Sequence, residues 1–428
     1  MKNVLNHTSF LYYWMVARIV RALMATFDAP GPLGVAMISC YRDETDVRQF
    51  GFWDKESLPE ILSWTRYVWE GVKGRLYMIG TLTPYIAGDL SDDNSQQRAC
   101  NQFKLAVTTA VAEGAEVILF AAATKRLAEI RRPGDVLFKE ELIRDFPGVT
   151  FTLGDNFTGL LLGRQILSAF ELMSLPKTSR VLVIAPYGLL GNVAVQYLAT
   201  AGANVIGLGN PKRMDLLEKM RDKFGIEICT SFEEVGPVDL VVACNTSEQV
   251  KLTKERVAFL QRPHRKLPVI DPCEPYNLAP DNLQQCEGSV IRMDGGNAFS
   301  QGLHYVLGSL SYKLLRLDRG ITWGCFAETF ILGLYPQLRS LNWMEITPSN
   351  IQVIEGFLGH KEGQFELTQP LCYNRKISER EFNLHLPRRK RFNITIWQKS
   401  HTVDRVKVTQ GLLSGLLAVC FYGVVPRP

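Results

Sequence analysis

The chain has 428 residues, of which 46% are hydrophobic and 21% are charged, so it is long and apolar enough to bury the cores of about two or three domains. This composition excludes a disordered or collagen-like chain. The 48 Lys and Arg residues exceed the 43 Asp and Glu residues only slightly, which does not indicate nucleic-acid binding. The nine cysteines form no C-x-x-C pair, which argues against a disulfide framework or a zinc site and favours a reducing cytoplasm.

The first apolar stretch covers residues 10–27 and contains Arg18 and Arg21. Because the two arginines interrupt it and no clean small-residue cleavage site follows, we expect no secretory signal. The spacing of its apolar residues is that of an amphipathic helix. Packing on the body of the protein is the simpler interpretation, and a helix on a membrane surface is the alternative.

Short apolar strands and an amphipathic helix alternate in the first part of the chain, as the spacing of their apolar residues indicates. These segments are residues 76–80 (strand), 98–113 (helix) and 117–120 (strand). A longer helix is expected over 158–175 and ends at Pro176, because proline cannot continue a helix. Together these elements predict an α/β substrate-binding domain over residues 1–175.

A second and clearer α/β pattern follows. Its strands are short, apolar and separated by helical stretches, which predicts a doubly wound parallel sheet. They are residues 180–184, 202–208, 239–243 and 267–270. We therefore predict a Rossmann-like domain over 176–300, then a helical segment over 301–375 that packs on the first domain, and a C-terminal extension over 376–428.

A glycine-containing turn joins the first strand of this pattern to the helix that continues from Asn192. The free N–H groups at the start of that helix would attract a pyrophosphate. Ala185 stands where a first glycine is usual, and Pro186 contributes no N–H. The strand–turn–helix–strand order still predicts dinucleotide binding, with an empty Rossmann-like fold as the alternative. The expected cofactor contacts in the turn are Ala185, Tyr187, Gly188, Leu189, Leu190 and Gly191.

The end of the second strand carries no Asp or Glu that would bind the ribose of NAD. The chain instead continues through Asn210 to Lys212 and Arg213, and these two cations would neutralise a 2′-phosphate. This pattern favours NADPH over NADH as the cofactor. A solvated basic helix start is the alternative interpretation of the same residues.

Cys325 follows Gly324 at the start of an apolar helix. The positive field of a helix N-terminus favours the nucleophilic thiolate, so Cys325 is the first candidate for covalent catalysis. An inert core cysteine is the common alternative. Cys244 and Cys273, near the ends of sheet strands, compete for the same role. His304 is the candidate general acid, against a purely structural role.

Several motifs occur in a fixed order between about residues 55 and 375. They are Gly154-Asp155-Asn156-Phe157-Thr158 with Arg164-Gln165, the turn at 181–191, Val269-Ile270-Asp271 with Gly295-Gly296, Gly324-Cys325-Phe326-Ala327-Glu328, Asn342-Trp343, Ile346-Thr347, residues 351–355, and Gly359-His360. This order resembles the cyanobacterial long-chain acyl-[acyl-carrier-protein] reductases. The chain departs from that family at Ala185-Pro186, where the family has glycine, and in residues 376–428, for which the family has no equivalent.

The resemblance implies a reaction for this chain. The thiolate of Cys325 would form an acyl-enzyme from a fatty acyl thioester, and NADPH would reduce it to a fatty aldehyde. Asn156 and Thr158 would orient the acyl carbonyl. The acyl group would arrive on an acidic carrier, either acyl carrier protein or CoA. Candidate docking residues for this carrier are Arg126, Arg131 and Arg132.

Two other functions stay open at this point. The first is an NAD(P)-dependent dehydrogenase of a small hydroxy or amino acid, with a shikimate-dehydrogenase-like architecture and a buried, inert Cys325. The second is a non-catalytic lipid- or nucleotide-binding module, in which Ala185-Pro186 marks the loss of the nucleotide. Trapping an acyl adduct on Cys325 would exclude the first, and a failure to bind NADPH would favour the second.

The C-terminal residues carry a basic run over 386–392 and an uncharged apolar run over 411–425. The apolar run is shorter than the roughly 18 to 20 residues that a spanning helix needs. A buried helix or strand is the simpler interpretation. A peripheral contact with anionic lipid, made by both runs together, is the alternative.

Overall fold

The computed structural model describes residues 32–245, 247–306 and 317–385, together with 14, 15, 17–19, 22, 23 and 315. The chain divides into two units between Leu384 and His385, and all described residues except His385 belong to the first unit. Most of the amphipathic stretch over 10–27 lies outside the described residues, and so do the basic and apolar C-terminal runs. No helix within the described ranges is long and apolar enough to cross a membrane.

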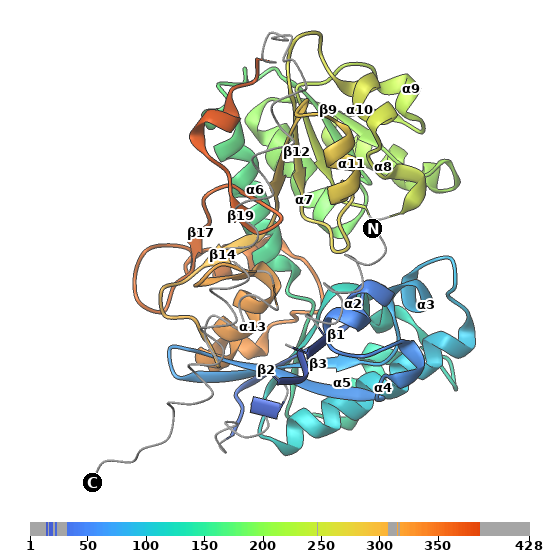
Figure 1. Cartoon of the computed structure of the whole chain (residues 1–428), viewed down its shortest axis with the longest axis vertical. Coiled ribbons are helices and arrows are strands. Elements are labelled where there is room, and N and C mark those ends of the chain that lie inside the picture. Colours follow the sequence, from blue (N-terminus) through green and yellow to red (C-terminus); the bar gives the residue numbers. More distant parts are fainter. Residues whose placement is uncertain are drawn as a thin grey trace. The chain divides into compact units, whose positions relative to one another are not determined.

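The first sheet contains six strands, namely β1 (Val35–Cys40), β2 (Ile61–Trp69), β3 (Val72–Ile79), β4 (Val117–Phe120), β7 (Thr150–Thr152) and β15 (His304–Tyr305). Their order is β15–β2–β3–β1–β4–β7 (Figure 1). β3, β1, β4 and β7 are parallel, whereas β2 and β15 add antiparallel pairs at one edge. The central strands are apolar on both faces because α4 (Asp93–Ala112) packs on one face and α13 (Gly324–Leu334) on the other.

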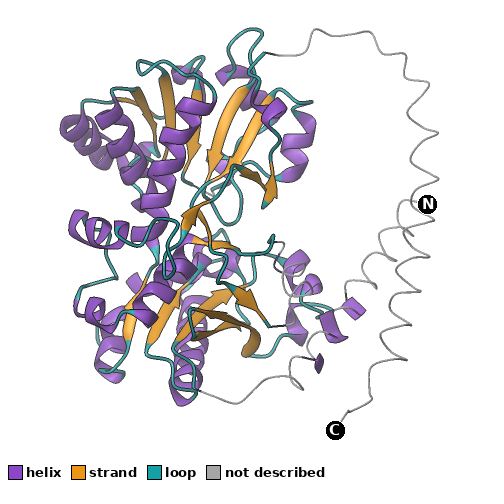
Figure 2. Cartoon of the chain, turned by 90° about the vertical axis from the view of Figure 1, so that its left-hand side faces the viewer, coloured by secondary structure: helices purple, strands orange, loops and turns teal. Residues whose placement is uncertain are grey.

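The second sheet also contains six strands, namely β8 (Arg180–Ile184), β9 (Asn204–Leu208), β10 (Glu227–Cys229), β11 (Leu240–Ala243), β12 (Leu267–Asp271) and β13 (Val290–Asp294). Their order is β10–β9–β8–β11–β12–β13, and every pair is parallel. Figure 2 shows helices flanking both sets of strands. The predicted Rossmann-like doubly wound sheet and the separate N-terminal α/β sheet are therefore confirmed.

Successive side chains of the second sheet point to opposite faces and pack in two separate hydrophobic cores. Val181 and Val183 face α6 (Asp155–Leu172) and α7 (Leu189–Ala201), whereas Leu182 and Ile184 face the opposite layer, which contains α10 (Lys254–Leu260). The first half of α6 also packs in the core of the first sheet. This one helix therefore contributes to the cores of both sheets.

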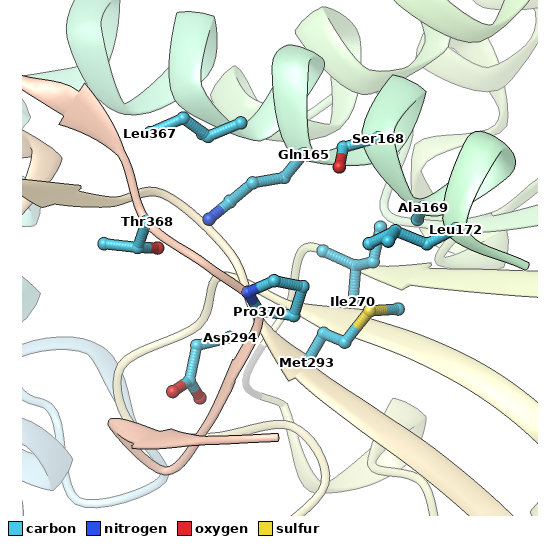
Figure 3. A pocket seen from close by; sticks show the side chains of 10 residues that line it. All are labelled: Gln165, Ser168, Ala169, Leu172, Ile270, Met293, Asp294, Leu367, Thr368 and Pro370. Carbon is cyan, nitrogen blue, oxygen red and sulfur yellow. The ribbon is translucent and has the colours of Figure 1, made fainter. Parts of the chain in front are cut away.

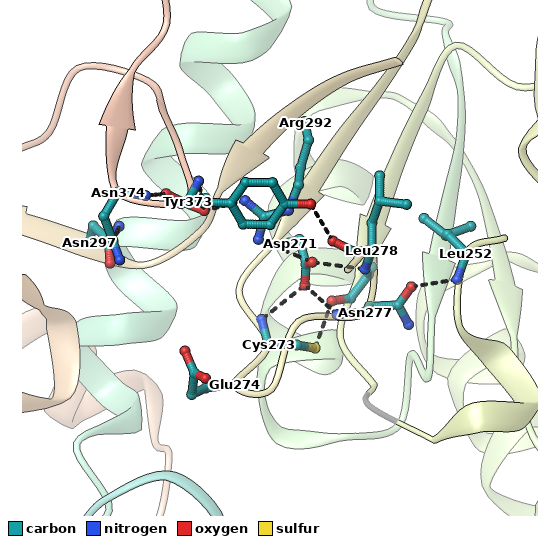
Figure 4. Close-up of polar contacts among 12 residues, drawn as sticks. Leu252, Asp271, Cys273, Glu274, Asn277, Leu278, Arg292, Asn297, Tyr373 and Asn374 are labelled. Carbon is teal, nitrogen blue, oxygen red and sulfur yellow. Dashed lines mark hydrogen bonds and ion pairs between the residues drawn. The ribbon is translucent and has the colours of Figure 1, made fainter. Parts of the chain in front are cut away.

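A buried polar network holds the C-terminal hairpin of the first unit against β13 (Figure 4). The Arg292 side chain is fully buried, pairs with Asp271 at 3.2 Å and with Asp294, and lies over the ring of Tyr373 at 4.0 Å. Asp294 also accepts hydrogen bonds from the backbone N–H groups of Tyr373, at 3.0 Å, and Asn374. Because a buried charge must be paired, these contacts hold each other in place. The hairpin consists of β18 (Leu371–Cys372) and β19 (Arg375–Lys376).

The first unit extends beyond residue 376, the predicted start of the C-terminal extension. A 3-10 helix follows over Glu379–Phe382, and the N–H of Lys266 donates to the carbonyl of Leu384 at 2.6 Å. The backbone of β12 is thus bonded, through the residue that precedes it, to the last residue of this unit. Residues 376–384 belong to the fold that carries the second sheet.

Candidate functional site

The glycine turn between β8 and α7 is tightly closed. The N–H of Gly188 donates to the carbonyl of Ala185 at 3.0 Å, and a Cβ added to Gly191 would lie 2.0 Å from that same oxygen. Only glycine fits at 191. The N-cap residue of α7 is Gly188, which has no side chain to cap the helix, and the first N–H groups of α7 lie beside the turn. This is the arrangement that the strand–turn–helix pattern predicts for a pyrophosphate site.

Ala185 occupies the left-handed region, with φ +58°. A side chain in this conformation costs about 1–2 kcal/mol, while a glycine loses about 0.5–1 kcal/mol more chain entropy on folding. We therefore expect Ala185→Gly to raise the free energy of unfolding by about 0.5–1 kcal/mol in urea titrations. Ala199→Gly, inside helix α7, is the matched control and should lower it by a similar amount. A loss of stability in Ala185→Gly would contradict this account of the turn.

The end of β9 meets the glycine turn through Tyr187. The N–H of Asn210 donates to the Tyr187 hydroxyl at 3.0 Å, and the Asn210 side chain accepts from the N–H of Lys212 at 2.9 Å. Lys212 and Arg213 are exposed in the short 3-10 helix that follows. The structure thus brings the predicted turn residues and the predicted 2′-phosphate residues together.

Cys325 is the second residue of α13 and is partly buried. A Cβ added to Gly154 would lie 2.2 Å from the Cys325 Cβ, so the chain before α6 passes directly against the cysteine. The N–H of Gly324 donates to the carbonyl of Gly296 at 2.8 Å, which anchors the start of α13. The N-terminus of α13 therefore lies against the turn that begins α6.

A partly buried ion pair lies beside this cysteine. Lys125, in a 3-10 helix after β4, donates from Nζ to Asp155 Oδ1 at the start of α6. Burial opposes the charged form of Lys125, but Asp155 and Cys325 raise the pKa of the ammonium above its usual value. Burial raises the pKa of the Cys325 thiol to about 11, and Lys125 opposes that rise. The resting group is a thiol with a cation close enough to stabilise its thiolate.

The cluster of Cys325, Lys125, Asp155 and Glu328 contains three residues that the sequence did not single out as site residues. Asp155 and Glu328 lie within two of the motifs that carry the family resemblance, so the sequence did point to their positions. Lys125 had none beyond its position shortly after a buried strand. Glu328 is fully buried on α13, one turn after Cys325, and accepts hydrogen bonds from the chain around α6.

The two residues expected to orient an acyl carbonyl are engaged within the protein. Asn156 donates from Nδ2 to the carbonyl of Glu345 at 3.1 Å and accepts on Oδ1 from the N–H of Thr347 at 3.2 Å. Thr158 donates to the carbonyl of Gly154 at 2.8 Å. These contacts shape the turn around Cys325. They give no support to a direct contact between either side chain and substrate.

The other predicted catalytic residues lie elsewhere. His304 is exposed on β15, paired with Val68 at the edge of the first sheet, and has no contact with Cys325 among those found in the described ranges. Cys244 and Cys273 follow β11 and β12, and burial raises the pKa of both thiols well above the usual value. The Cys273 thiol also donates to the carbonyl of Ala243 at 3.0 Å. Both are poorer nucleophiles than a thiol beside a lysine.

Two of the three expected docking arginines are committed to ion pairs. Arg131 pairs with Asp135 at 2.7 Å, and Arg132 pairs with Glu141 at 2.9 Å. Arg126 is exposed. Within the described ranges no group of three or more His, Cys, Asp or Glu side chains is placed to hold a metal ion.

A pocket lies between α6, the second sheet and residues 367–370 (Figure 3). It is lined by Gln165, Ser168, Ala169, Leu172, Ile270, Met293, Asp294, Leu367, Thr368 and Pro370. Its one ionisable lining residue, Asp294, is already paired with Arg292. Its lining includes neither the residues of the Cys325 cluster nor those of the glycine turn.

No protein-family model matches the chain, and no curated protein matches it. L-Tryptophan dehydrogenase from Nostoc punctiforme is 12% identical over 76% of this chain and 82% of that chain, with a TM-score of 0.36. A mutant glutamate dehydrogenase is 14% identical over 62% and 64%, with a TM-score of 0.37. Shikimate 5-dehydrogenase from Thermus thermophilus, in complex with NADP(H) and shikimate, is 15% identical over 48% and 63%, with a TM-score of 0.27. Likenesses this weak assign neither a family nor an activity to this chain.

Proposed function

We propose that this chain is an NAD(P)H-dependent oxidoreductase that reduces a carbonyl group bound beside Cys325, Lys125 and Asp155. The relation between α6 and α7 supports this proposal. Cβ atoms added to Gly159 and Gly163 would meet Val193 and Tyr197 with the same offset along both helices. The two helices therefore run parallel, and their N-termini lie at the same end. The glycine turn lies at the N-terminus of α7, and the cysteine cluster lies at the N-terminus of α6.

The second sheet fits a dinucleotide. Gly191 lets the turn close, because a Cβ there would lie 2.0 Å from the Ala185 carbonyl oxygen, and the N–H groups at the start of α7 would bind a pyrophosphate. Lys212 and Arg213 would pair with a 2′-phosphate at the end of β9. When bound, the nucleotide supplies the hydride. The preferred cofactor in this proposal is NADPH.

The phosphate preference depends on Arg213. We expect Arg213→Asp to weaken NADPH binding by about 10²-fold, because a carboxylate would replace the cation at the 2′-phosphate, whereas NADH binding should change by less than about threefold. Titration of the quenching of protein fluorescence by each nucleotide measures both constants. Lys219→Asp, an exposed lysine of α8 (Met214–Phe224), is the control for the charge change alone. An equal loss for both nucleotides would remove the argument for NADPH.

The more specific proposal is reduction of a long-chain acyl thioester, and the position of Cys325 carries it. Cys325 gives up its proton, its Sγ bonds to the acyl carbonyl carbon, and the bond from that carbon to the carrier sulfur breaks; the carrier leaves as a thiol with the proton. After hydride addition to the bound acyl group, the Sγ–carbon bond breaks, an aldehyde leaves, and the thiolate takes up a proton. Lys125 and the first N–H groups of α13 would stabilise the oxyanion in both steps.

Intact-mass spectrometry tests the acyl-thioester proposal directly. Mixing with a C16 or C18 acyl thioester should add one acyl group to the protein without NADPH, and adding NADPH should remove it with release of the aldehyde. The Cys325→Ala protein is the matched control and should take up no acyl group. An unmodified mass in both tubes would contradict the proposal.

A second candidate is favoured by the Lys125–Asp155 pair. A dehydrogenase of a small hydroxy or amino acid needs a group that holds a proton next to the reacting oxygen or nitrogen, and the Lys125 ammonium paired with a buried carboxylate would do so. In this reaction Cys325 only packs. Activity on such a substrate that survives Cys325→Ala and is lost in Lys125→Met would favour this candidate over thioester reduction.

A further inference from the structure

Glu328 connects the two helix starts that meet at the cysteine. Its side chain is fully buried on α13, and its two oxygens have separate donors. Oε1 accepts from the Thr152 hydroxyl at 2.5 Å, and Oε2 accepts from the N–H of Phe157 at 2.8 Å. Phe157 lies in the first turn of α6, where N–H groups have no partner within the helix. A carboxylate of α13 therefore caps α6.

The contacts of Glu328 form a closed path that returns to Cys325. The Thr152 hydroxyl, which donates to Glu328, accepts from the N–H of Gly154 at 2.8 Å. Gly154, with φ +69°, is the residue against which Cys325 packs. Glu328 and Cys325 lie one turn apart on the same helix. Loss of the carboxylate would release the turn that positions Gly154 and Asp155 next to the sulfur.

The charges around Glu328 come from three elements. Glu328 interacts electrostatically with Asp155 on α6 and with Lys125 after β4. It also acts electrostatically on Cys325, which lies on its own helix. Burial raises the pKa of Glu328 from 4.5 to about 7, whereas the hydrogen bonds from Thr152 and Phe157 lower it. In its ionised form Glu328 raises the pKa of the Cys325 thiol. The same carboxylate thus holds the thiol in place and opposes its ionisation.

We propose that Glu328 is the positioning residue of this centre: it ties the start of α6 to α13 and so holds Cys325 against the Gly154 turn, beside Lys125 and Asp155. The proposal deepens the acyl-thioester function, and rests on it, because it assigns Glu328 a part in presenting the sulfur to the carbonyl. It also assigns Glu328 two separable effects, one through its hydrogen bonds and one through its charge. Substitutions at Glu328 and at Thr152 separate them.

Glu328→Gln removes the charge and replaces one of the two hydrogen-bond-accepting oxygens with an N–H₂ group. We expect iodoacetamide to alkylate Cys325 faster at a given pH, because the pKa of the thiol falls when the neighbouring negative charge is lost. We expect acyl transfer from a C16 thioester to fall by about 10²-fold, because a loss of position of this kind outweighs the gain in thiolate. Thr152→Val keeps the charge but removes the hydroxyl that links Glu328 to the N–H of Gly154, so acyl transfer should fall while the alkylation profile stays within about a factor of two.

The measurement follows alkylation of Cys325 by peptide mass spectrometry between pH 6 and pH 10, with acyl transfer followed by intact mass. Glu355→Gln, an exposed partner of Arg164, is the control and should change neither. Circular dichroism melting verifies that each variant is folded. Acyl transfer at the normal rate in folded Glu328→Gln, or an unmoved alkylation profile, would overturn the proposal. If the unaltered protein takes up no acyl group, the proposed function fails, while a moved alkylation profile still supports the link between Glu328 and Cys325.

Discussion

Replacing Cys325 with alanine is expected to abolish the acyl adduct and to lower aldehyde formation by about 10³-fold or more. The reason is that no other group in the cluster of Lys125, Asp155 and Glu328 would form a thioester with the substrate. The change removes one sulfur from a partly buried position, so the free energy of unfolding should fall by no more than about 1 kcal/mol. The measurement is aldehyde release from a C16 thioester with NADPH, by gas chromatography.

Cys244→Ala and Cys273→Ala are the matched controls, because both cysteines compete for the nucleophile's role. Burial raises the pKa of both thiols well above the usual value, and among the residues that the structure describes neither has a lysine that opposes the rise as Lys125 does for Cys325. Each variant should retain turnover within about threefold. Aldehyde formation that persists at the normal speed in Cys325→Ala would end the acyl-enzyme proposal and leave the Lys125–Asp155 dehydrogenase as the candidate.

Replacing Gly154 with alanine is expected to lower the free energy of unfolding by about 2–5 kcal/mol. The backbone there has φ +69°, which costs an alanine about 1–2 kcal/mol, and the new methyl group would lie 2.2 Å from the Cys325 Cβ. The backbone must shift to relieve such a contact, and this shift costs about 1–3 kcal/mol. The shift would displace Cys325 from Lys125, so acyl transfer should fall with stability. Urea unfolding and intact mass measure the two effects.

Gly134→Ala separates the two causes. Gly134 has φ +88°, but within the described part of the chain no atom lies within 4 Å of a Cβ added there. The substitution should cost only the backbone term of about 1–2 kcal/mol and leave acyl transfer unchanged. Equal losses of stability in both variants would show that the contact with Cys325 contributes nothing.

Local patterns were enough to predict the strands and turn around the glycines. Short-range alternation and glycine positions predicted the strand over 180–184, the turn after it and the strand that ends at Leu208. In the structure these segments are β8, the turn and β9. β13 was missed because Arg292 and Asp294 interrupt its apolar run. Both charges are paired in the interior, and sequence alone gives no sign of that pairing.

The boundaries of the longer helices were displaced by capping. The predicted helix over 158–175 begins at Asp155, because Gly154 turns the chain in the left-handed region, and it ends at Leu172, before Pro176. The predicted helix over 98–113 begins at Asp93, because the Asp92 side chain accepts from the N–H of Ser95. Turn chemistry therefore decided where these helices start.

The candidate site was predicted in part. Cys325 carried a local signal, a cysteine after glycine at a helix start, whereas Lys125 reaches the site only because β4 and β7 are neighbours in the sheet. His304 was chosen for its nearness to Cys325 in sequence, but the strand that contains it pairs with β2 and leads to the sheet edge. Neighbourhood along the chain does not substitute for topology.

The hairpin pinned by Arg292 sets a limit on how far the chain can be shortened. Ending the chain before Leu371 would remove Tyr373 and the two N–H groups that donate to Asp294. The buried charges of Arg292, Asp271 and Asp294 would then lose part of the contacts that surround them. Ending it just after the hairpin would still delete the carbonyl of Leu384 that receives the Lys266 N–H. A truncated protein prepared for crystallisation should therefore retain every residue through Leu384.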